Sequence, residues 1–574
     1  MKQSSFPAGD HYIEPTAFGT WIRSPAVRET IESVLIAVLL ALLFRYFEAE
    51  AYVIPTGSMA PDLQGQHIDV ACPECDFNYR SGSSADLPDV PRVACPNCMY
   101  PQTMLKNTRR DHRPFSGDRI LVNKFAYDFD EPDRWDVIVF KYPNNGKQNF
   151  IKRLIGLPNE GILIEHGDIY AYDLRTETFA DRKICRKPPL KQKSMLQMVY
   201  DTKHISKTLL AVGWPSRWQQ WKDGDSENAW RVSDDHDQFS LNNSTEQTQW
   251  LKYRHLQPTK KEWDDRLALR TPELPERMRG KIPAGELISD HYAYNDVPDK
   301  GTFLNNGGLH WVGDLAIEAN VEIKSDSGTL VIELVEGPDR FQCQIDVSTG
   351  QAVFVENGTQ ASNVTLEGET KHETSIKGTG DHQILFANAD NKLFLWVDDN
   401  FVGGCEYTRS GDLLPTWSLE DAGDAEPIGI GGRNIQMQIS RLQVQRDIYY
   451  TSKNMTVEMG KSYAKFPFSE YLARINVADI KDMMRQPRSW TTEKVKNFFK
   501  LRDRDESYVF PLDENQLLPM GDNSPQSSDA RIWEGARYLD KSYLLGEAMF
   551  IYWPHAKTSP LPFWPNFERM KFIR

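Results

Sequence analysis

A serine and a lysine of this chain have the surroundings that a nucleophile and its base require. Ser58 lies in a turn that contains Gly and Pro, 56–61. A serine hydroxyl is a poor nucleophile and needs a base within hydrogen-bond reach, usually His and sometimes a Lys kept out of water. Lys152 lies in the apolar run 150–156, where strand alternation places it on an apolar face and turns Arg153 the other way, toward an acidic partner. Burial lowers the pKa of a lysine, so Lys152 is the candidate base for Ser58.

Four of the seven cysteines form a second candidate site. Cys72 and Cys75 are separated by two residues, as are Cys95 and Cys98, and nineteen residues lie between the pairs. This spacing is typical of a four-thiolate zinc ribbon, which would be structural because four protein ligands leave no open position. Disulfides are the alternative, because the segment would lie in an oxidising compartment. The sequence therefore predicts a structural zinc ion and no cofactor for catalysis.

One segment has the composition of a membrane anchor. Residues 33–44 are uncharged, and the run reaches the roughly 20 residues of a spanning helix over 26–46 if two glutamates lie at the interface. A cleavable signal peptide is the alternative, since 49–51 offers small residues at A-x-A spacing. The polar-rich residues 1–25 differ from a short basic n-region and favour an uncleaved anchor. Arginines ahead of the span place the N-terminus inside.

The composition indicates several folded units. The chain has 574 residues, which is too long for one ordinary core, and its fifteen Trp exclude a disordered chain. A formal net charge of −14 without clustered Lys and Arg excludes a nucleic-acid-binding surface.

A β-sandwich is predicted in the second half of the chain. Apolar and polar residues alternate over 315–323 and 330–334, and 394–404 is typical of a hairpin. Several strands at such spacing indicate a sandwich, similar in strand texture to laminin-G and concanavalin-like jelly rolls. Its aromatic side chains either form the core or bind a glycan or protein partner, and core is the favoured reading.

Four ordered motifs carry a resemblance to a known family. They are the segment 52–63 around Ser58, the strands 117–125 and 134–143, the segment 150–158 around Lys152, and the stretch 521–531 that begins Gly-Asp-Asn. On these motifs the chain resembles the bacterial type I signal peptidases, or leader peptidases, which are serine proteases with a Ser-Lys dyad. The resemblance covers under a third of the chain.

The resemblance implies a role for each matching residue. Ser58 would attack the scissile carbonyl, and Lys152, neutral at the start, would take its proton. The backbone N–H of Ser58 and the hydroxyl of Thr56 would form the oxyanion hole. Ser527 would orient the Lys152 ammonium group. The other wall residues implied are Asp529 in an ion pair with Arg153, supported by Arg531 and Asp522.

Four positions depart from the family pattern. Trp135 and Asn159 stand where the family usually has Gly, 524–525 replaces a more polar, Arg-containing turn, and Ala530 replaces a usual Ser. None removes the nucleophile or the base, but together they leave the form of the last wall open.

The predicted fold is mainly β, an antiparallel signal-peptidase-like catalytic body split by a zinc-ribbon insert and a large insert that contains a β-sandwich, with one N-terminal transmembrane helix. The expected segments are a tail 1–25, an anchor 26–46, a catalytic domain of 47–71, 99–165 and 510–574, a ribbon insert 72–98, an unassigned Trp-rich insert 166–305, a sandwich 306–450 and a helix-prone return segment 451–509.

The expected function is removal of signal peptides from exported preproteins after small residues, at A-x-A sites. The enzyme would be a single-pass protein of the bacterial inner membrane with its catalytic domain on the outer, periplasmic face. Its partners would be preproteins and the lipid bilayer but no nucleic acid, and the sandwich would take any glycan or protein partner.

Two rival functions stay open. The first is a catalytically vestigial, membrane-anchored adhesion protein that acts through the sandwich. The second is a self-cleaving Ser-Lys regulator, but such proteins carry DNA-binding segments and none is visible here.

Overall fold

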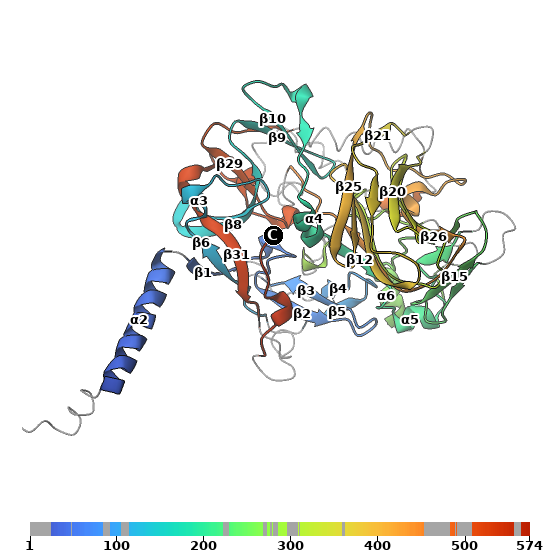
Figure 1. Cartoon of the computed structure of the whole chain (residues 1–574), viewed down its shortest axis with the longest axis horizontal. Coiled ribbons are helices and arrows are strands. Elements are labelled where there is room, and N and C mark those ends of the chain that lie inside the picture. The colour runs from blue at the N-terminus through green and yellow to red at the C-terminus, as the bar shows by residue number, and fades with distance from the viewer. Residues whose placement is uncertain are drawn as a thin grey trace, which may run out of the picture.

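The computed structural model contains two β-rich bodies side by side, with helix α2 projecting from the first (Figure 1). The described residues are 25–47, 49–83, 92–104, 114–221, 229–267, 273–275, 278, 285–295, 308, 310–358, 362–452, 483–487, 490, 508–555 and 564–574. The predicted tail, up to residue 24, and most of the predicted return segment 451–509 lie outside them.

The first body is built on two antiparallel sheets. The larger has the strand order β1 (Ala49–Val53), β6 (Arg119–Asn123), β31 (Leu544–Trp553), β7 (Val137–Tyr142), β8 (Asn145–Gly156), β29 (Gln516–Met520) and β30 (Leu539–Asp540). The smaller has the order β11 (Lys183–Ile184), β10 (Asp168–Asp173), β9 (Glu160–Glu165) and β28 (Phe510–Pro511). Buried side chains of both sheets, such as Phe140, Leu154, Ile162 and Leu517, share one core. The segments around Ser58 and Lys152 and the chain's last part therefore fold as one unit.

The second body is a sandwich of two antiparallel sheets. The larger has the order β14 (Trp230–Val232), β15 (Phe239–Asn243), β27 (Ile435–Arg446), β17 (Leu315–Ile323), β23 (Gly380–Ala389), β24 (Lys392–Val397), β25 (Asn400–Arg409) and β21 (Val364–Glu367), and β12 (Gln197–Asp201) also pairs with β27. The smaller has the order β13 (Trp218–Gln220), β16 (Gln249–Tyr253), β26 (Ile428–Arg433), β18 (Thr329–Glu336), β19 (Asp339–Asp346), β20 (Gln351–Glu356) and β22 (Lys371–Glu373). Inward side chains of both sheets, including Ile317, Phe341 and Tyr407, form its core. The prediction of a mainly β chain with antiparallel sheets is confirmed.

The region 166–305, which the sequence left without an assignment, supplies strands β12 to β16 of the sandwich. Trp218 and Trp230 lie in its core. Strands β13 and β14 have only three residues each, which is too short to show an alternating pattern. The sequence pattern therefore did not predict these strands of the sandwich.

The paired cysteines lie on two small hairpins. The first joins β2 (His67–Ala71) to β3 (Asn78–Gly82), and the second joins β4 (Arg92–Ala94) to β5 (Pro101–Thr103). These hairpins share a buried cluster with Trp214, Leu256 and Trp263 of the large insert. The two inserts therefore pack against each other.

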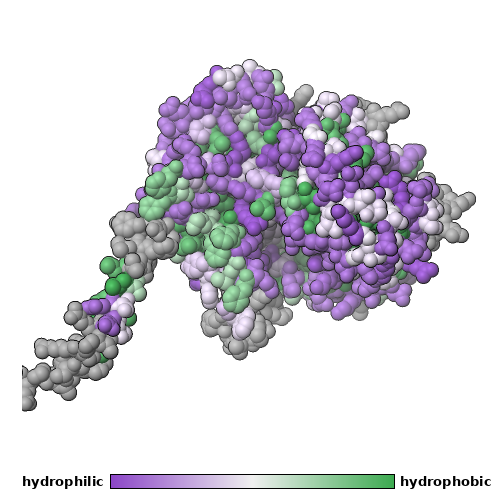
Figure 2. Space-filling model, viewed as in Figure 1, coloured by the Kyte–Doolittle hydropathy of each residue, from purple (hydrophilic) through white to green (hydrophobic). Residues whose placement is uncertain are grey.

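Helix α2 (Pro25–Phe47) covers the segment predicted as an anchor, and the other α-helices are short: α3 (Ala126–Phe129), α4 (Pro189–Met195), α5 (Lys207–Ala211) and α6 (Lys260–Leu267). Within the described ranges, no helix has the length and apolarity needed to cross a membrane. Apolar residues cover parts of α2 and of the adjoining first body, whereas the sandwich face seen in Figure 2 is mostly hydrophilic.

Trp135, in the first body, packs against residues of the large insert, and its backbone conformation is strained. Its φ of 76° lies in the left-handed region, which favours glycine and which bulky residues rarely adopt. The indole is 2% exposed and its Nε1 donates to the Arg186 carbonyl at 3.2 Å. Its ring lies 5.1 Å from the Lys187 ammonium and 6.3 Å from the Tyr450 ring. The contacts at the start and end of the insert compensate for the backbone strain.

Trp135→Ala is expected to lower the free energy of unfolding by about 3 to 5 kcal/mol, because a large buried ring is lost. Trp135→Gly is expected to be about 1 kcal/mol more stable than Trp135→Ala, because only Gly adopts a positive φ without strain. Thermal or denaturant unfolding measures both. The control is Trp533, which is 5% exposed at φ −64°, so its Gly variant should be the less stable of the two. If the Gly and Ala variants had the same order of stability at both positions, the positive φ of Trp135 would not be the cause of the strain.

Candidate active site

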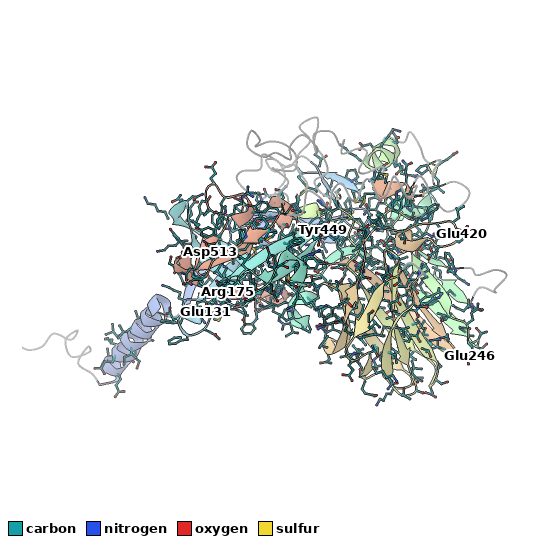
Figure 3. All side chains as sticks on the ribbon, turned by 90° about the horizontal axis from the view of Figure 1, so that it is seen from above. Glu131, Arg175, Glu246, Glu420, Tyr449 and Asp513 are labelled. Carbon is teal, nitrogen blue, oxygen red and sulfur yellow. The ribbon has the colours of Figure 1, made fainter. Side chains whose placement is uncertain are left out.

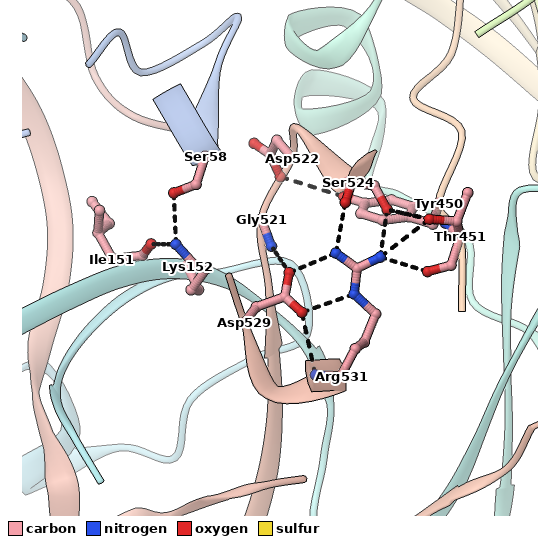
Figure 4. Close-up of polar contacts among 10 residues, drawn as sticks. All are labelled: Ser58, Ile151, Lys152, Tyr450, Thr451, Gly521, Asp522, Ser524, Asp529 and Arg531. Atoms are coloured by element: carbon pink, nitrogen blue, oxygen red, sulfur yellow. Dashed lines mark hydrogen bonds and ion pairs between the residues drawn. The ribbon is translucent and has the colours of Figure 1, made fainter. Parts of the chain in front are cut away.

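The structure places Ser58 and Lys152 in direct contact. The Lys152 Nζ lies 2.6 Å from the Ser58 Oγ and 3.0 Å from the carbonyl oxygen of Ile151, both as hydrogen bonds (Figure 4). Lys152 is 4% exposed and Ser58 is 7% exposed. The Phe150 ring lies 5.5 Å from Nζ, on the face that the alternation predicts. A hydroxyl and an amine at this distance can exchange a proton once the amine is neutral.

Burial makes the neutral amine accessible near physiological pH. Loss of hydration lowers the pKa of Lys152 from 10.5 to about 8. Asp529 and Asp522 oppose this shift, and Arg531 adds to it. Burial is the largest of these effects, so the amine can serve as a base in a way that a solvated lysine cannot.

The motif 521–523 packs against the turn that carries Ser58 and hydrogen-bonds to it. Ser58 lies in the 3-10 turn η1 (Gly57–Met59), and the Asn523 backbone N–H donates to the Ser58 carbonyl at 3.0 Å. A Cβ on Gly521 would lie 2.3 Å from that same carbonyl oxygen and 2.3 Å from the Ser527 Oγ. Only glycine permits so close an approach, so Gly521 sets how near the wall comes to the nucleophile.

The predicted ion pair between Asp529 and Arg153 is wrong. Arg153 forms a bidentate pair with Asp522, with Nε–Oδ1 and Nη2–Oδ2 distances of 2.7 Å each. Met520, the last residue of β29, is the register partner of Arg153, and Asp522 follows two residues later beside that side chain. Asp529 instead binds Arg531 at 2.7 and 2.8 Å, because the two lie two residues apart around the turn η9 (Ala530–Ile532). All four side chains are buried.

The departure at 524–525 connects this wall to the large insert. The Ser524 Oγ accepts hydrogen bonds from the Arg531 Nη1 at 2.8 Å and from the Thr451 backbone N–H at 3.0 Å. Arg531 also donates to the Thr451 carbonyl at 2.6 Å. The residues that resemble the family's last motif therefore bind the end of the insert as well (Figure 4).

Two predicted residues are not placed in their expected roles. Ser527 is fully buried beside Gly521, but in the described structure the hydrogen bonds of Lys152 go to Ser58 and Ile151, not to Ser527. Thr56 is exposed at the start of η1, and its hydroxyl makes no cap bond to that turn. Its place in an oxyanion hole stays a prediction.

Two residues of the large insert lie at the site without having been predicted. Tyr294 packs on Gly57, and Asn295 hydrogen-bonds Asn523. They belong to the unassigned region 166–305, and no local pattern marks them because their role arises from long-range packing.

The four cysteines converge on one point. Cys72 Sγ lies 3.6 Å from Cys98 Sγ, and Cys75 Sγ lies 3.6 Å from Cys95 Sγ. All four sulfurs lie within 4.8 Å of one another, and all four residues are buried. An S–S bond is about 2.05 Å long, whereas the edges of a tetrahedron with Zn–S bonds of about 2.3 Å are about 3.8 Å. The donor set therefore fits a zinc ion and contains no disulfide.

The two cysteine loops have the same backbone hydrogen bonds. The Asp76 N–H donates to the Cys72 carbonyl at 2.9 Å, and the Met99 N–H donates to the Cys95 carbonyl at 2.7 Å. Asp76 and Met99 also share a positive φ, 56° and 60°. Each loop thus presents its two thiols in the same way toward a common centre.

Comparison with known proteins finds signal peptidases that are similar to parts of this chain. The model of the family "Signal peptidase, peptidase S26" matches residues 108–212 and 428–553. A probable signal peptidase I-1 of Synechocystis is 26% identical over 25% of this chain and 51% of the relative. A signal peptidase I of Pseudomonas fluorescens is 26% identical over 31% of this chain and 58% of the relative. The matched segments of this chain are therefore similar to the S26 family of signal peptidases.

The chain matches only about half the length of these two relatives. Among solved structures, a carbohydrate-binding module of Bacillus subtilis, CBM66, is similar over 40% of this chain and 93% of that chain, at 8% identity and a TM-score of 0.19. So low a score supports no conclusion about the sandwich.

Replacing the buried amine by an apolar group should stabilise the protein at neutral pH. The pKa of Lys152 is about 8 when folded and 10.5 when solvated, so between these values the unfolded chain binds more protons and stability rises with pH. Below pH 8 the folded state bears the full cost of a buried ammonium. Lys152→Met is expected to raise the unfolding free energy at pH 7 by about 3 kcal/mol and to remove that rise.

The control is Lys187→Met, because Lys187 is equally buried but hydrogen-bonded to Asp390 and Asp447 at 2.7 to 2.8 Å. Its loss leaves carboxylates unpaired and should destabilise the protein. Chemical unfolding between pH 6 and 10.5 measures both variants. A Lys152→Met chain less stable than the parent at pH 7 would contradict the lowered pKa.

Proposed function

We propose that this chain is a signal peptidase I that cleaves signal peptides from exported preproteins after small residues, at A-x-A sites. The observation that carries the proposal is the 2.6 Å contact between the Lys152 amine and the Ser58 hydroxyl, both of which are buried. The match of residues 108–212 and 428–553 to the S26 family supports it.

The proposed reaction uses this chain's own side chains in both directions of proton transfer. Neutral Lys152 takes the proton of the Ser58 hydroxyl while the oxygen attacks the scissile carbonyl carbon. The Ser58 N–H and the Thr56 hydroxyl stabilise the oxyanion, and the Lys152 ammonium then gives its proton to the leaving amine. The same amine next activates a water molecule, which hydrolyses the acyl-enzyme and restores Ser58.

The proposal also covers the location of the enzyme in the cell. We propose that α2 holds the chain at the bacterial inner membrane, with the first body on the outer face. The side chains of Val34, Leu35, Ile36, Val38 and Leu39 support this, since each is 50 to 61% exposed on the helix. A preprotein held in the same bilayer would meet Ser58 with much of its orientation already restricted.

We also propose that the four cysteines bind a structural zinc ion. Their separations fit tetrahedral thiolates, and four protein ligands leave no position for a substrate or water. The ion would hold the two hairpins together beside the nucleophile turn, and the reaction itself would need no cofactor.

Ser58→Ala and Lys152→Ala should each abolish cleavage of a preprotein with an A-x-A site, by at least about 10³-fold in kcat. The measurement uses the full chain in lipid vesicles. Ser348→Ala and Lys141→Ala, at exposed positions away from the site, serve as matched controls and should keep normal activity. Normal cleavage by the Ser58 and Lys152 variants would contradict the dyad. A parent chain that binds a partner but cleaves nothing would favour the adhesion function.

The purified chain should contain one zinc ion, and Cys72→Ser or Cys98→Ser should lose it together with at least about 5 °C of thermal stability. Elemental analysis and a thermal melt measure both effects, with Cys343→Ser, in the sandwich core, as the control. Titration of thiols in the denatured, chelated and unreduced chain should find all seven cysteines. Only three titratable thiols and no zinc would show that disulfides join the two pairs instead.

A further inference from the structure

A short segment of the large insert reaches the turn that carries Ser58. This segment, 290–295, ends in the 3-10 turn η5 (Ala293–Asn295), whose three residues are all buried. The sequence assigns it no function, and nothing in the resemblance to the S26 family covers it. Its contacts with the nucleophile turn are nevertheless direct.

Asn295 and Asn523 form a reciprocal amide pair. The Asn295 Nδ2 donates to the Asn523 Oδ1 at 2.7 Å, and the Asn523 Nδ2 donates to the Asn295 Oδ1 at 2.7 Å. The Asn523 Nδ2 also donates to the Gly57 carbonyl at 3.0 Å. Asn295 and Asn523 are 5% and 3% exposed. Since an amide nitrogen has two protons, both of those on Asn523 Nδ2 are used, and its orientation is determined.

This contact controls the direction of an N–H group that the proposed reaction needs. The Gly57 carbonyl and the Ser58 N–H belong to one planar, trans peptide unit, in which they point in opposite directions. Holding the Gly57 oxygen against Asn523 therefore aims the Ser58 N–H away from it. The Asn523 N–H holds the next carbonyl, that of Ser58, at 3.0 Å. Asn523 thus contacts both peptide planes around the nucleophile, and the Ala60 backbone N–H also donates to the Gly57 carbonyl, at 3.1 Å.

Tyr294 closes the same turn from the other side. A Cβ on Gly57 would lie 2.0 Å from the Tyr294 ring, and one on Gly82, at the end of β3, would lie 2.7 Å from it. The ring therefore lies between the nucleophile turn and the cysteine hairpin. Its hydroxyl donates to the Gln66 carbonyl at 3.3 Å.

The sandwich holds the segment in place. Arg446, at the end of β27, donates from Nη2 to the carbonyls of Asp290 and His291 at 3.2 and 3.1 Å. His310 lies 3.0 Å from the Asp290 carboxylate and stacks on Tyr449, with ring centroids 4.8 Å apart. Viewed from above, Tyr449 lies between the two bodies (Figure 3). A continuous path of contacts therefore runs from the sandwich to Ser58.

We infer that Asn295 is a positioning residue of the active site, which acts through Asn523 to aim the Ser58 N–H at the developing oxyanion. The large insert thereby completes the active site, in addition to any partner its sandwich binds. This inference rests on the proposed function, since it assigns the Ser58 N–H to an oxyanion hole.

The test is a double-mutant cycle in the full chain with Asn295→Ala, Asn523→Ala and the double variant. Asn295→Ala should lower kcat about 10- to 100-fold and change KM less than about 2-fold, because the reacting groups are misaligned while substrate contacts remain. The part of the pH dependence of kcat that reports the ionisation of Lys152 should stay at the same pH. The double variant should be no slower than Asn523→Ala, because Asn295 acts only through that residue.

Two further variants separate positioning from packing. Asn295→Asp keeps the volume of the side chain but loses the donor, so it should be slowed like Asn295→Ala, whereas a pure packing role predicts normal kcat. Asn243→Ala removes another buried amide, at the far end of the sandwich in β15, and should leave kcat unchanged. Additive losses in the cycle, or a normal kcat for Asn295→Ala, would overturn the inference.

A readout without catalysis distinguishes this failure from failure of the proposed function. Amide hydrogen exchange of the peptide that contains 55–60 should be faster in Asn295→Ala than in Asn243→Ala, whether or not the chain cleaves preproteins. If Ser58→Ala still cleaves, the proposed function fails, but faster exchange would still show that Asn295 fixes the turn. If exchange and turnover are both normal in Asn295→Ala, the positioning role fails and the proposed function stands.

Discussion

An amine surrounded by protein atoms holds its proton less tightly than an amine in water, and the arrangement around Ser58 depends on this difference. The pKa of Lys152 is lowered to about 8 chiefly by burial. The two carboxylates that oppose this shift are each bound bidentately by a separate arginine, Asp522 by Arg153 and Asp529 by Arg531. With these charges paired among themselves, burial decides the protonation of the amine.

Keeping an amine dry beside a hydroxyl requires parts of the chain that lie far apart in sequence. Strand β8 places Lys152 between β7 and β29, and η1 places Ser58 over it. The motif after β29 supports the turn from below, and Asn295 of the large insert holds that motif. The large insert is therefore not an appendage, because Tyr294 touches the nucleophile turn and Asn295 touches its support.

The sequence predicted the parts of the site that local patterns encode. Alternation in the apolar run 150–156 placed Lys152 on the correct face, and two-residue spacings identified the thiol cluster. The strained, positive φ at Trp135, and the buried contacts of its ring, were not predictable from the sequence.

The sequence did not reveal which buried charges pair with each other. Asp522 and Asp529 lie near each other in the motif, and only the register of β29 on β8 decides that Arg153 binds Asp522. Asn295 has no local signature at all, because its partner is 228 residues away. The short strands that carry Trp218 and Trp230 were not predicted for a related reason, since it is pairing with other strands that stabilises them.

The most direct test of the account is the titration of the Lys152 amine itself. The chemical shift of its εCH₂ group, followed by NMR from pH 6 to 11 in the full chain and assigned with Lys152→Met, reports its protonation. The expected midpoint of this titration is about 8. A midpoint near the ordinary value of 10.5 would leave only about one amine in 3,000 neutral at pH 7, against about one in ten for a midpoint of 8, and Lys152 would then not be the base for Ser58.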